Sequence, residues 1–256
     1  HVPMMEKNPW QAVFNNIVGS RVAMEMAIKH HVERFVLVST DKAVRPTNVM
    51  GASKRVTELI MQCQQGNGTR FMAVRFGNVV GSSGSVIPLF RRQIEQGGPV
   101  TVTHPEINRF FMTIPEAAQM ILQAGTMGEG GEIFILRMGT PIKIADMARD
   151  LIRLSGKEPD VDIKIVFTGL RDGEKLYEEL ITEGEDILPT QHKKVMVLRS
   201  NGLFNGAKNP QEAKEHLYDK LDRLTEMAAR HDSKGIKIKL KEIVAEYTPQ
   251  ENESVF

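Results

Sequence analysis

The stretch RFVLVSTDKAVRPTNVMGASKR, residues 34–55, decides the fold. Its first part, Arg34 to Thr40, is a short continuous apolar run, which is typical of a strand covered on both faces of a sheet. The polar loop DKAVRPTN follows. Residues Val49 to Gln65 then place apolar side chains at helical spacing, until the sequence GNG ends the predicted helix.

Elements on either side extend this pattern. A helix is expected from Pro9 to His31, and a second apolar strand from Arg70 to Phe76. Strand, helix and strand, with a further helix before them, predict a parallel α/β sheet. The same signals predict helices at 88–96, 115–126, 144–155, 209–231 and 236–247, and strands at 100–103, 110–113, 132–136, 163–168 and 194–199.

The composition excludes several classes of protein. The 256 residues include 33 Lys plus Arg and 32 Asp plus Glu, a formal net charge of +1, which leaves no electrostatic footprint for nucleic acid. The single cysteine, Cys63, cannot form a disulfide within the chain, and the histidines show no metal-ligand spacing, so no metal site is expected. No run of about 18 apolar residues could span a bilayer, so we expect this segment to be soluble.

The polar residues that follow the first strand are the leading catalytic candidates. Asp41 and Lys42 put an acid beside an amine, directly after Thr40, and such a pair can act as general acid and base when burial and neighbours tune it. A plain polar loop is the alternative interpretation of the same residues. Met50 and Lys54 lie four positions apart at the start of the next helix, so they share one side of it.

The order Thr40, Met50, Lys54 resembles the Ser/Thr, Tyr, Lys arrangement of the short-chain dehydrogenase/reductase superfamily. In that superfamily the Tyr removes a hydroxyl proton and the Lys holds the nicotinamide ribose. Here the Tyr position is Met50, and a thioether has no proton to exchange. The extended branch of the superfamily, which acts on nucleotide sugars, contains one subfamily that tolerates this change.

Four longer motifs resemble that subfamily, the nucleotide-sugar 4,6-dehydratases of bacterial capsule and O-antigen biosynthesis. They are HVPMMEKNPWQAVFNNIVGS, STDKAVRPTNVMGASKR, RFGNVVGSSGSVIPLF and RDGEKLYEEL. The resemblance covers about residues 1 to 200. It implies an α/β protein with a Rossmann-like parallel sheet that lacks its N-terminal half, a smaller α/β substrate-binding region and C-terminal helices. The implied divisions are 1–80 for the cofactor half-domain, 81–200 for the substrate region, interleaved with a returning strand near 132–136, and 201–256 for the helical extension.

The resemblance also implies a reaction and a role for each candidate. Oxidation at C4 of UDP-N-acetylglucosamine by NAD or NADP acidifies C5, and the hydride later returns to C6. Lys42 would act as the base at C5, Asp41 would protonate the departing C6 hydroxyl, and Thr40 would bind the C4 oxygen. The cofactor would be held by Asn16, Met50 and Lys54.

The substrate side follows from the same resemblance and from the chemistry of the residues. A planar Arg offers paired donors to a pyrophosphate, and a carboxylate can accept from ribose hydroxyls. The expected substrate-binding residues are His1, Pro3, Asn78, Arg109, Arg171 and Glu174. A turn residue at Asn78, a surface charge at Arg109 and a solvated turn at RDGEK are the alternative interpretations.

One expected motif is missing. The sequence holds no Gly-x-Gly-x-x-Gly turn between a first strand and helix, and it begins with His1 rather than Met. We therefore expect a piece of a longer protein, which by itself binds NAD(P)+ poorly. The longer protein is expected at the cytoplasmic face of the bacterial inner membrane, anchored through an upstream segment, and as a homo-oligomer. A nucleotide-sugar 4-epimerase and a non-catalytic binding domain are the two competing hypotheses.

Overall fold

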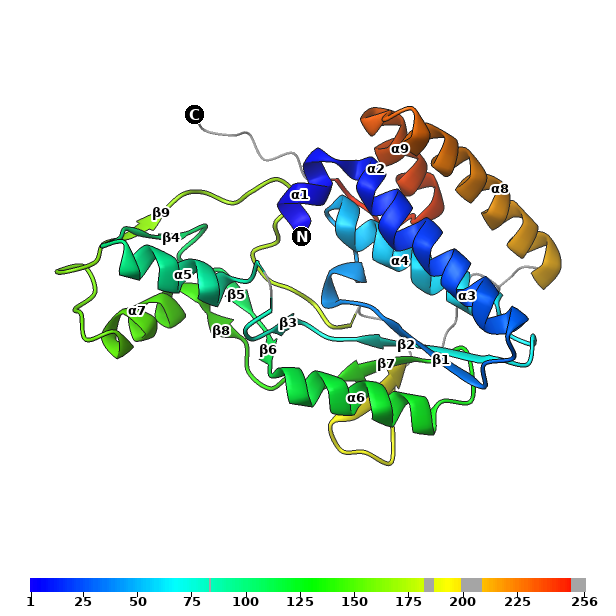
Figure 1. The fold of residues 1–256 in the computed structure, drawn as a ribbon, viewed down its shortest axis with the longest axis horizontal. Coiled ribbons are helices and arrows are strands. Elements are labelled where there is room, and N and C mark those ends of the chain that lie inside the picture. Colours follow the sequence, from blue (N-terminus) through cyan, green and yellow to red (C-terminus); the bar gives the residue numbers. More distant parts are fainter. Residues whose placement is uncertain (83, 182–186, 199–208, 250–256) are drawn as a thin grey trace.

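The computed structural model describes residues 1–82, 84–181, 187–198 and 209–249 (Figure 1). The helical elements are α1 (Val2–Lys7), α2 (Pro9–Ala12), the π-helix η1 (Val13–Val18), α3 (Gly19–Lys29), the 3-10 turn η2 (Asp41–Ala43), α4 (Val49–Cys63), α5 (Val86–Glu95), α6 (Ile114–Met127), α7 (Ile144–Leu154), α8 (Pro210–Ala229) and α9 (Ser233–Ile243). The strands are β1 (Arg34–Val38), β2 (Arg70–Arg75), β3 (Asn78–Val79), β4 (Val100–Val102), β5 (Asn108–Arg109), β6 (Phe111–Met112), β7 (Ile133–Leu136), β8 (Ile142–Lys143), β9 (Ile165–Phe167), β10 (Ile187–Pro189) and β11 (Val195–Leu198).

A five-stranded sheet forms the centre, in the order β1-β2-β7-β11-β10. Strands β1, β2 and β7 are parallel, which confirms the Rossmann-like α/β fold predicted from the sequence. Strand β11 pairs with β7 in the antiparallel sense, and β10 returns antiparallel to β11. This antiparallel edge was not expected, because the run at 194–199 carries no signal that fixes its direction.

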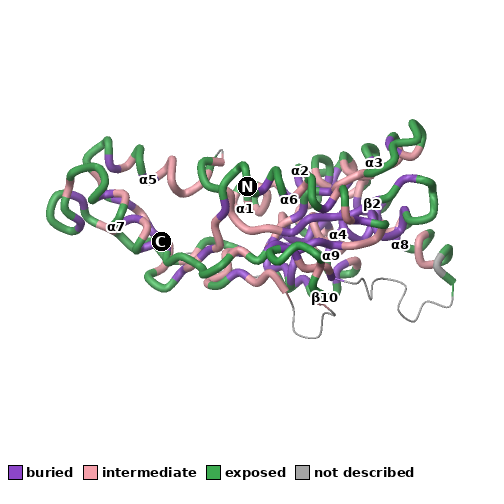
Figure 2. Tube along the Cα trace, turned by 90° about the horizontal axis from the view of Figure 1, so that it is seen from below, coloured by how far each residue is buried: buried purple, intermediate pink, exposed green. Residues whose placement is uncertain are grey.

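Helices cover both faces of the sheet. Figure 1 shows α3, α4 and α8 on one side and α6 on the other. The alternation of side chains along β2 explains why both layers are stable: Phe71 and Ala73 join the core beneath α4, whereas Met72 and Val74 join the core against α6. Figure 2 shows the buried residues gathered around β2 and α4.

Strand β1 departs from the two-sided burial that its apolar run predicts. It is the outermost strand of the sheet within the described residues, and only Leu37 of its five residues is buried. Val38, at its carboxyl end, is 40% exposed. Within the described residues β1 pairs with β2 alone, and its apolar side chains are correspondingly less buried than those of β2.

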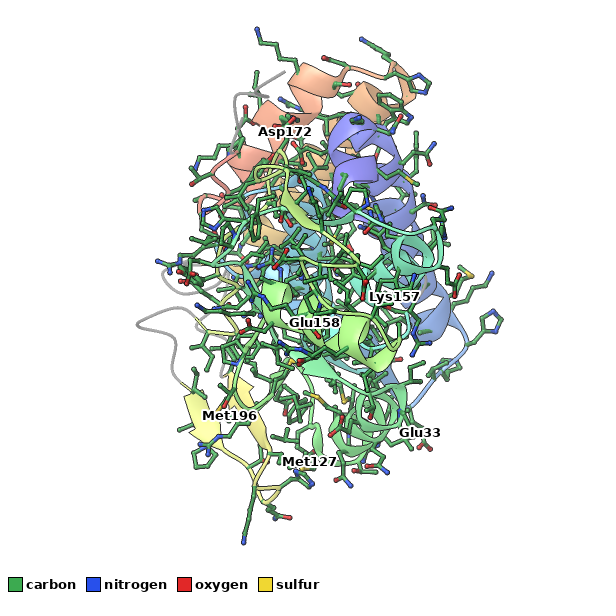
Figure 3. The ribbon with its side chains drawn as sticks, turned by 90° about the vertical axis from the view of Figure 1, so that its left-hand side faces the viewer. Glu33, Met127, Lys157, Glu158, Asp172 and Met196 are labelled. Carbon is green, nitrogen blue, oxygen red and sulfur yellow. The ribbon has the colours of Figure 1, made fainter. Side chains whose placement is uncertain are left out.

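A smaller lobe with its own core contains α5, α7 and the parallel pair β4 and β9. Figure 3 looks onto this lobe, where Lys157 and Glu158 follow α7. The core of the lobe packs Phe90 and Ile94 of α5 against Ala148 and Ile152 of α7. None of the helices in the described ranges combines the length and apolar character that crossing a bilayer requires.

The first thirty residues differ in detail from the single helix expected over 9–31. Helix α1 precedes it, and the helix itself contains the π-helical segment η1 between α2 and α3. A π-helical segment inserts an extra residue into the turn, and such segments often lie at functional sites. Asn16, one of the expected site residues, lies inside η1.

A buried ion pair joins the carboxyl end of β2 to α4. Arg75 and Glu58 are 1% and 0% exposed, and Arg75 donates to both carboxylate oxygens at 2.8 and 2.7 Å. Ser39 Oγ donates to the same carboxylate at 2.7 Å, and Arg55 adds a contact at 2.9 Å. Burial alone would raise the pKa of Glu58, but these partners outweigh it and lower the pKa from 4.5 to about 2.

Replacing Glu58 by Gln is expected to lower the free energy of unfolding by about 3–5 kcal/mol, because Arg75 then lies buried without its counter-charge. A depressed pKa stabilises the fold above the unfolded-state value, so the wild-type advantage should shrink as the pH falls from 4.5 toward 2. Urea unfolding at several pH values measures both effects. Glu25→Gln, which breaks the exposed pair with Arg21, is the control and should cost about 0–1 kcal/mol. Equal losses in the two variants would contradict the assignment.

Candidate active site

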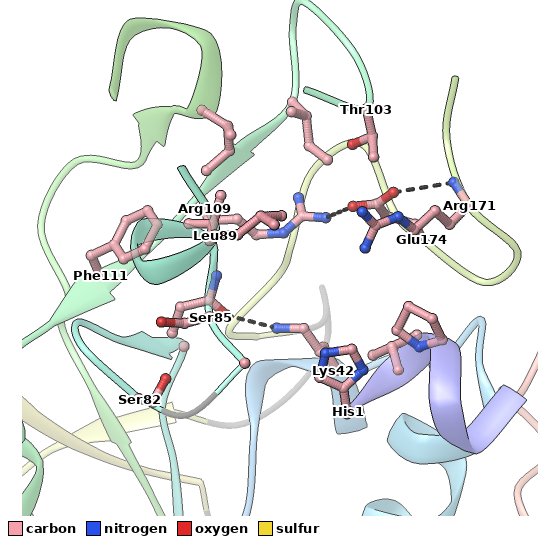
Figure 4. A pocket seen from close by; sticks show the side chains of 18 of the residues that line it. His1, Lys42, Ser82, Ser85, Leu89, Thr103, Arg109, Phe111, Arg171 and Glu174 are labelled. Carbon is pink, nitrogen blue, oxygen red and sulfur yellow. Dashed lines mark hydrogen bonds and ion pairs between the residues drawn. The ribbon is translucent and has the colours of Figure 1, made fainter. Parts of the chain in front are cut away.

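A cavity of about 450 Å³ opens beside the carboxyl ends of β1 and β2, between the sheet and the smaller lobe (Figure 4). The structure brings most of the expected site residues to its wall. Those that line it are His1, Pro3, Thr40, Lys42, Met50, Asn78, Arg109, Arg171 and Glu174. Sequence positions from 1 to 174 thus meet at one place, as expected for a site at the carboxyl edge of a parallel sheet.

Lys42 forms the polar floor of the cavity, and the expected site residue Asp41 lies behind it without lining the cavity. Lys42 Nζ donates to Asp41 Oδ1 at 2.9 Å and to Asn78 Oδ1 at 3.2 Å. The Asp41 side chain is completely buried, and it accepts a second hydrogen bond from Thr40 Oγ1 at 2.9 Å. Its other oxygen, Oδ2, has no hydrogen-bond partner among the described residues. Lys42 therefore faces the cavity, and Asp41 lies behind it.

The backbone of this floor is fixed by both strands and by α4. The amides of Ser39 and Asp41 donate to the carbonyls of Val74 and Phe76, so the pairing with β2 continues beyond β1. Asn48 caps α4 by accepting from the Gly51 amide at 2.8 Å. A Cβ atom on Gly51 would lie 2.1 Å from the carbonyl oxygen of Lys42, so only glycine lets α4 approach the floor this closely.

Met50 and Lys54 both belong to α4, but they have different surroundings. Met50 lines the cavity, whereas Lys54 donates to the carbonyl of Val38 at 3.1 Å and does not line it. Burial lowers the pKa of Lys54, against an opposing effect of Glu58. Asn16 also lies outside the wall of the cavity and donates to Ser53 Oγ at 2.8 Å, and Ser53 in turn donates to the carbonyl of Met50.

The loop RDGEK reaches the cavity because it docks on the start of α4. The carbonyl of Gly173 accepts from Thr47 Oγ1 at 2.9 Å and from Asn48 Nδ2 at 3.0 Å. Gly173 has a φ of +70°, and a Cβ there would lie 2.6 Å from the Cβ of Asn48. The docking places Glu174 in the wall, where its Oε1 lies 3.6 Å from the guanidinium of Arg109 (Figure 4).

Arg109 is held in place by hydrogen bonds and charges of the protein itself. It donates to the carbonyls of Asn108 and Lys175 at 2.6 and 2.8 Å, and its side chain is only 8% exposed. Its Nε also lies 3.7 Å from Oε1 of Glu178. The surface-charge interpretation of Arg109 is therefore wrong, because its guanidinium is enclosed at the end of the cavity.

Glu178 is the site residue that sequence reasoning missed. Its side chain is 2% exposed, and Oε1 lies 3.6 Å from Lys42 Nζ. In the sequence YEEL it looks like one of two helix-surface carboxylates, and nothing local separates it from Glu179. Only the docking of the RDGEK loop turns Glu178 inward. Within the described ranges, no three His, Cys, Asp or Glu side chains are grouped so that they could hold a metal ion.

A Rossmann-like sheet with a Thr-Asp-Lys turn at its carboxyl edge and a Lys on the following helix defines a protein of the short-chain dehydrogenase/reductase type. The match to the family described as "Polysaccharide biosynthesis protein" runs over residues 1–200, and the chain belongs to this family. This confirms the family resemblance inferred from the sequence.

Several relatives show the same similarity. The chain is 59% identical over 187 residues to the capsular polysaccharide biosynthesis protein CapD of Staphylococcus aureus, which covers 72% of the chain and 31% of CapD. It is 56% identical over 186 residues to the probable polysaccharide biosynthesis protein EpsC of Bacillus subtilis, again 72% of the chain and 31% of the relative. A UDP-glucose 4-epimerase of Rickettsia canadensis is 39% identical over 71% of the chain and 53% of its own length.

The chain thus spans about a third of the length of the first two curated relatives. Among solved structures, Pen from Bacillus thuringiensis has a TM-score of 0.72 and 33% identity, over 86% of this chain and 72% of Pen. The dTDP-glucose 4,6-dehydratase DesIV from Streptomyces venezuelae, solved with NAD and TYD bound, has a TM-score of 0.63 at 21% identity, over 71% of this chain and 61% of DesIV. The likeness to DesIV shows the shared fold.

Replacing Gly51 by Ala is expected to lower the free energy of unfolding by about 1–3 kcal/mol, because the new methyl group forces α4 away from the carbonyl of Lys42. Gly19→Ala is the control, since a Cβ there lies 3.5 Å from its nearest neighbour inside a regular helix. That change should be neutral or should stabilise the protein by about 0.4–1 kcal/mol. Chemical denaturation compares the two variants, and an equally neutral Gly51→Ala would show that the close approach is not required.

Proposed function

We propose that this chain is part of an NAD(P)-dependent nucleotide-sugar 4,6-dehydratase that converts UDP-N-acetylglucosamine to a UDP-4-keto-6-deoxy sugar. One observation carries the proposal: Lys42 lines the cavity with Asp41 hydrogen-bonded directly behind it, and the side chain at position 50, which lines the same cavity, is a methionine. A dehydratase needs an acid and a base next to the sugar ring. A dehydratase does not need a phenol at position 50 if other side chains make the proton transfers that the phenol would make.

The residues near β1 fit the nicotinamide end of NAD(P)+. Lys54 lies at the carboxyl end of β1 with its ammonium 3.1 Å from the Val38 carbonyl, and burial has already lowered its pKa, so its further donors suit ribose hydroxyls. Met50 supplies an apolar wall suited to a nicotinamide ring. When bound, the cofactor would accept a hydride from C4 of the sugar and return it at C6.

The chain's own residues would then manage the protons. Thr40 Oγ1, which donates to Asp41, is placed to hold the C4 oxygen. Lys42 would remove the proton from C5, since its amine is the basic group that faces the cavity. The proton that Lys42 takes from C5 could pass to Asp41 Oδ1, 2.9 Å from Lys42 Nζ, and from Asp41 to the departing C6 hydroxyl.

The other end of the cavity suits the UDP moiety. Arg171 and Glu174 line it from the docked RDGEK loop (Figure 4). Asn78 lines the same cavity and accepts from Lys42 Nζ at 3.2 Å. We assign Arg171 to the pyrophosphate and Glu174 to ribose hydroxyls, with Arg109 behind Glu174 as its counter-charge. His1 and Pro3 would border the sugar. We keep two further predictions for the intact protein: that it forms a homo-oligomer, and that it lies at the cytoplasmic face of the inner membrane.

A nucleotide-sugar 4-epimerase is the second candidate, favoured by the 39% identity to the Rickettsia canadensis enzyme. A 4-epimerase moves hydride away from and back to C4 and eliminates no water, so it has no use for an acid–base pair directed at C5 and C6. Met50 cannot act as its proton-transferring phenol. Both features favour the dehydratase.

The intact protein, incubated with NAD(P)+ and UDP-N-acetylglucosamine, is expected to yield a product lighter by one water in mass spectrometry. Lys42→Ala and Asp41→Asn should each reduce this conversion by about 10²-fold or more, while UDP-sugar binding measured by calorimetry is retained. A product of unchanged mass with inverted C4 would instead establish the epimerase. Near-normal dehydration by both variants would refute the assigned roles.

Met50→Ala is expected to lower the dehydration rate far less than Lys42→Ala, because no proton passes through a thioether. Steady-state rates of the two variants at the same saturating substrate concentration make the comparison. A loss at Met50→Ala as large as that at Lys42→Ala would mean that the shape of this wall controls the reaction as strongly as the base.

A further inference from the structure

Glu178 is a buried carboxylate that the proposed proton steps do not use. Oε1 lies between two cations, 3.6 Å from Lys42 Nζ and 3.7 Å from Arg109 Nε. Oε2 is buried and has no hydrogen-bond partner among the described residues. Most buried carboxylates satisfy both oxygens, so one without a partner calls for an explanation.

The surroundings of Glu178 give it access to the reaction site. A second cavity of about 110 Å³ adjoins the first, and Lys42, Asn78, Arg109 and Glu178 all line it. The carboxylate therefore lies beside the same ammonium that Asp41 Oδ1 contacts, with Oε1 3.6 Å from Lys42 Nζ. Glu178 does not line the main cavity, so it would not touch the sugar.

A base at C5 must first lose its own proton, and the resting arrangement opposes this. Burial alone would lower the pKa of Lys42, but the charges of Asp41 and Glu178 outweigh burial and raise the pKa. Lys42 is thus held as an ammonium. Burial raises the pKa of Glu178 despite the opposing pull of Lys42, Arg109 and Lys175, and the charge of Asp41 adds to the rise. A carboxylate with a raised pKa is a suitable proton acceptor.

We propose that Glu178 accepts a proton from Lys42, so that Lys42 meets the substrate as a neutral amine. An N–H bond of Lys42 Nζ breaks and its electron pair stays on nitrogen, while an O–H bond forms on Glu178 Oε1. The net charge of the two groups is unchanged, and no further reactant is required. Glu178 acts through Lys42 and is a positioning residue for the proton. This inference rests on the proposed dehydratase function.

The charges around the pair support a transfer inside the protein in preference to release of the proton to water. Lys42 is 14% exposed and Glu178 2%, so water has little access to either. Converting an ammonium and a carboxylate into an amine and an acid removes two buried charges, which lowers the desolvation cost that both pay. Asp41, Arg109 and Lys175 are the other groups whose charges act on Glu178.

The pH dependence of turnover in the intact protein tests this transfer. An internal proton acceptor makes the fraction of neutral Lys42 independent of pH over the neutral range. In Glu178→Gln the proton must leave to solvent, so kcat should be reduced by about 10-fold or more near pH 6 and should rise with pH. KM for UDP-N-acetylglucosamine should change less than about two-fold, since Glu178 would not contact the sugar. The ratio of the two pH profiles isolates the contribution of Glu178.

Two further variants separate proton transfer from a structural role. Glu178→Asp keeps the carboxyl group and should restore the flat profile with reduced kcat. Glu179→Gln removes the neighbouring carboxylate, which pairs with Arg45 at the surface, and should behave like the wild type. A Glu178→Gln profile parallel to the wild type, or a loss confined to KM, would overturn the proposal. Melting curves verify that each variant is folded.

A readout that needs no turnover distinguishes failure of this proposal from failure of the proposed function. The rate at which Lys42 reacts with acetic anhydride, followed by peptide mass spectrometry, reports its neutral fraction. Loss of the internal proton acceptor should decrease this rate near pH 6 in Glu178→Gln, with the rate of Lys54 as the reference. A change of Lys42 reactivity in Glu178→Gln, together with no dehydration by the wild type, would refute the proposed function alone. Dehydration with identical Lys42 reactivity in both proteins would refute the transfer alone.

Discussion

The buried contact between Arg75 and Glu58 is the constraint on which the rest of the site depends. It joins the last residue of β2 to the middle of α4, and Ser39 attaches the end of β1 to the same carboxylate. Strands β1 and β2 and helix α4 are therefore fixed to one another below the cavity, and with them Thr40 and Lys42 after β1 and Met50 on α4. A charge buried this deeply is tolerated only with its partner present, so the geometry is specified as well as stabilised.

The start of α4 is held from outside the sheet as well. Glu6 of α1 accepts from the Val49 amide at 2.8 Å and pairs with Lys237 of α9 at 2.7 Å. The segment after α9 returns to the catalytic loop, where the Thr248 amide donates to the carbonyl of Pro46. The family match ends at residue 200, yet helices beyond it complete the support of the active-site loop.

The local sequence was enough to predict the elements that form from their own apolar pattern and end signals. The three parallel strands, helix α4 and the Thr40–Lys42 turn follow from apolar runs and a stop signal, and the structure has them within a residue or two. It could not predict the direction of β11, the exposure of β1 or the enclosure of Asp41, because each depends on which elements lie beside it. Glu178 is the clearest case, since it differs from Glu179 only through the docking of the preceding RDGEK loop on the start of α4, which is distant in the sequence.

The methionine at position 50 and the buried carboxylate at position 178 both bear on which groups of the site can exchange protons. Because Met50 stands where a phenol could have exchanged protons, proton transfer in the proposed reaction depends on the other polar side chains of the site. These groups form a continuous line: Thr40 Oγ1 and Lys42 Nζ both contact Asp41 Oδ1 at 2.9 Å, and Lys42 Nζ also lies 3.6 Å from Glu178. Asp41 Oδ2 and Glu178 Oε2 are its two ends without partners. In the proposed reaction, these contacts would let Lys42 exchange a proton with a carboxylate on Asp41 or on Glu178.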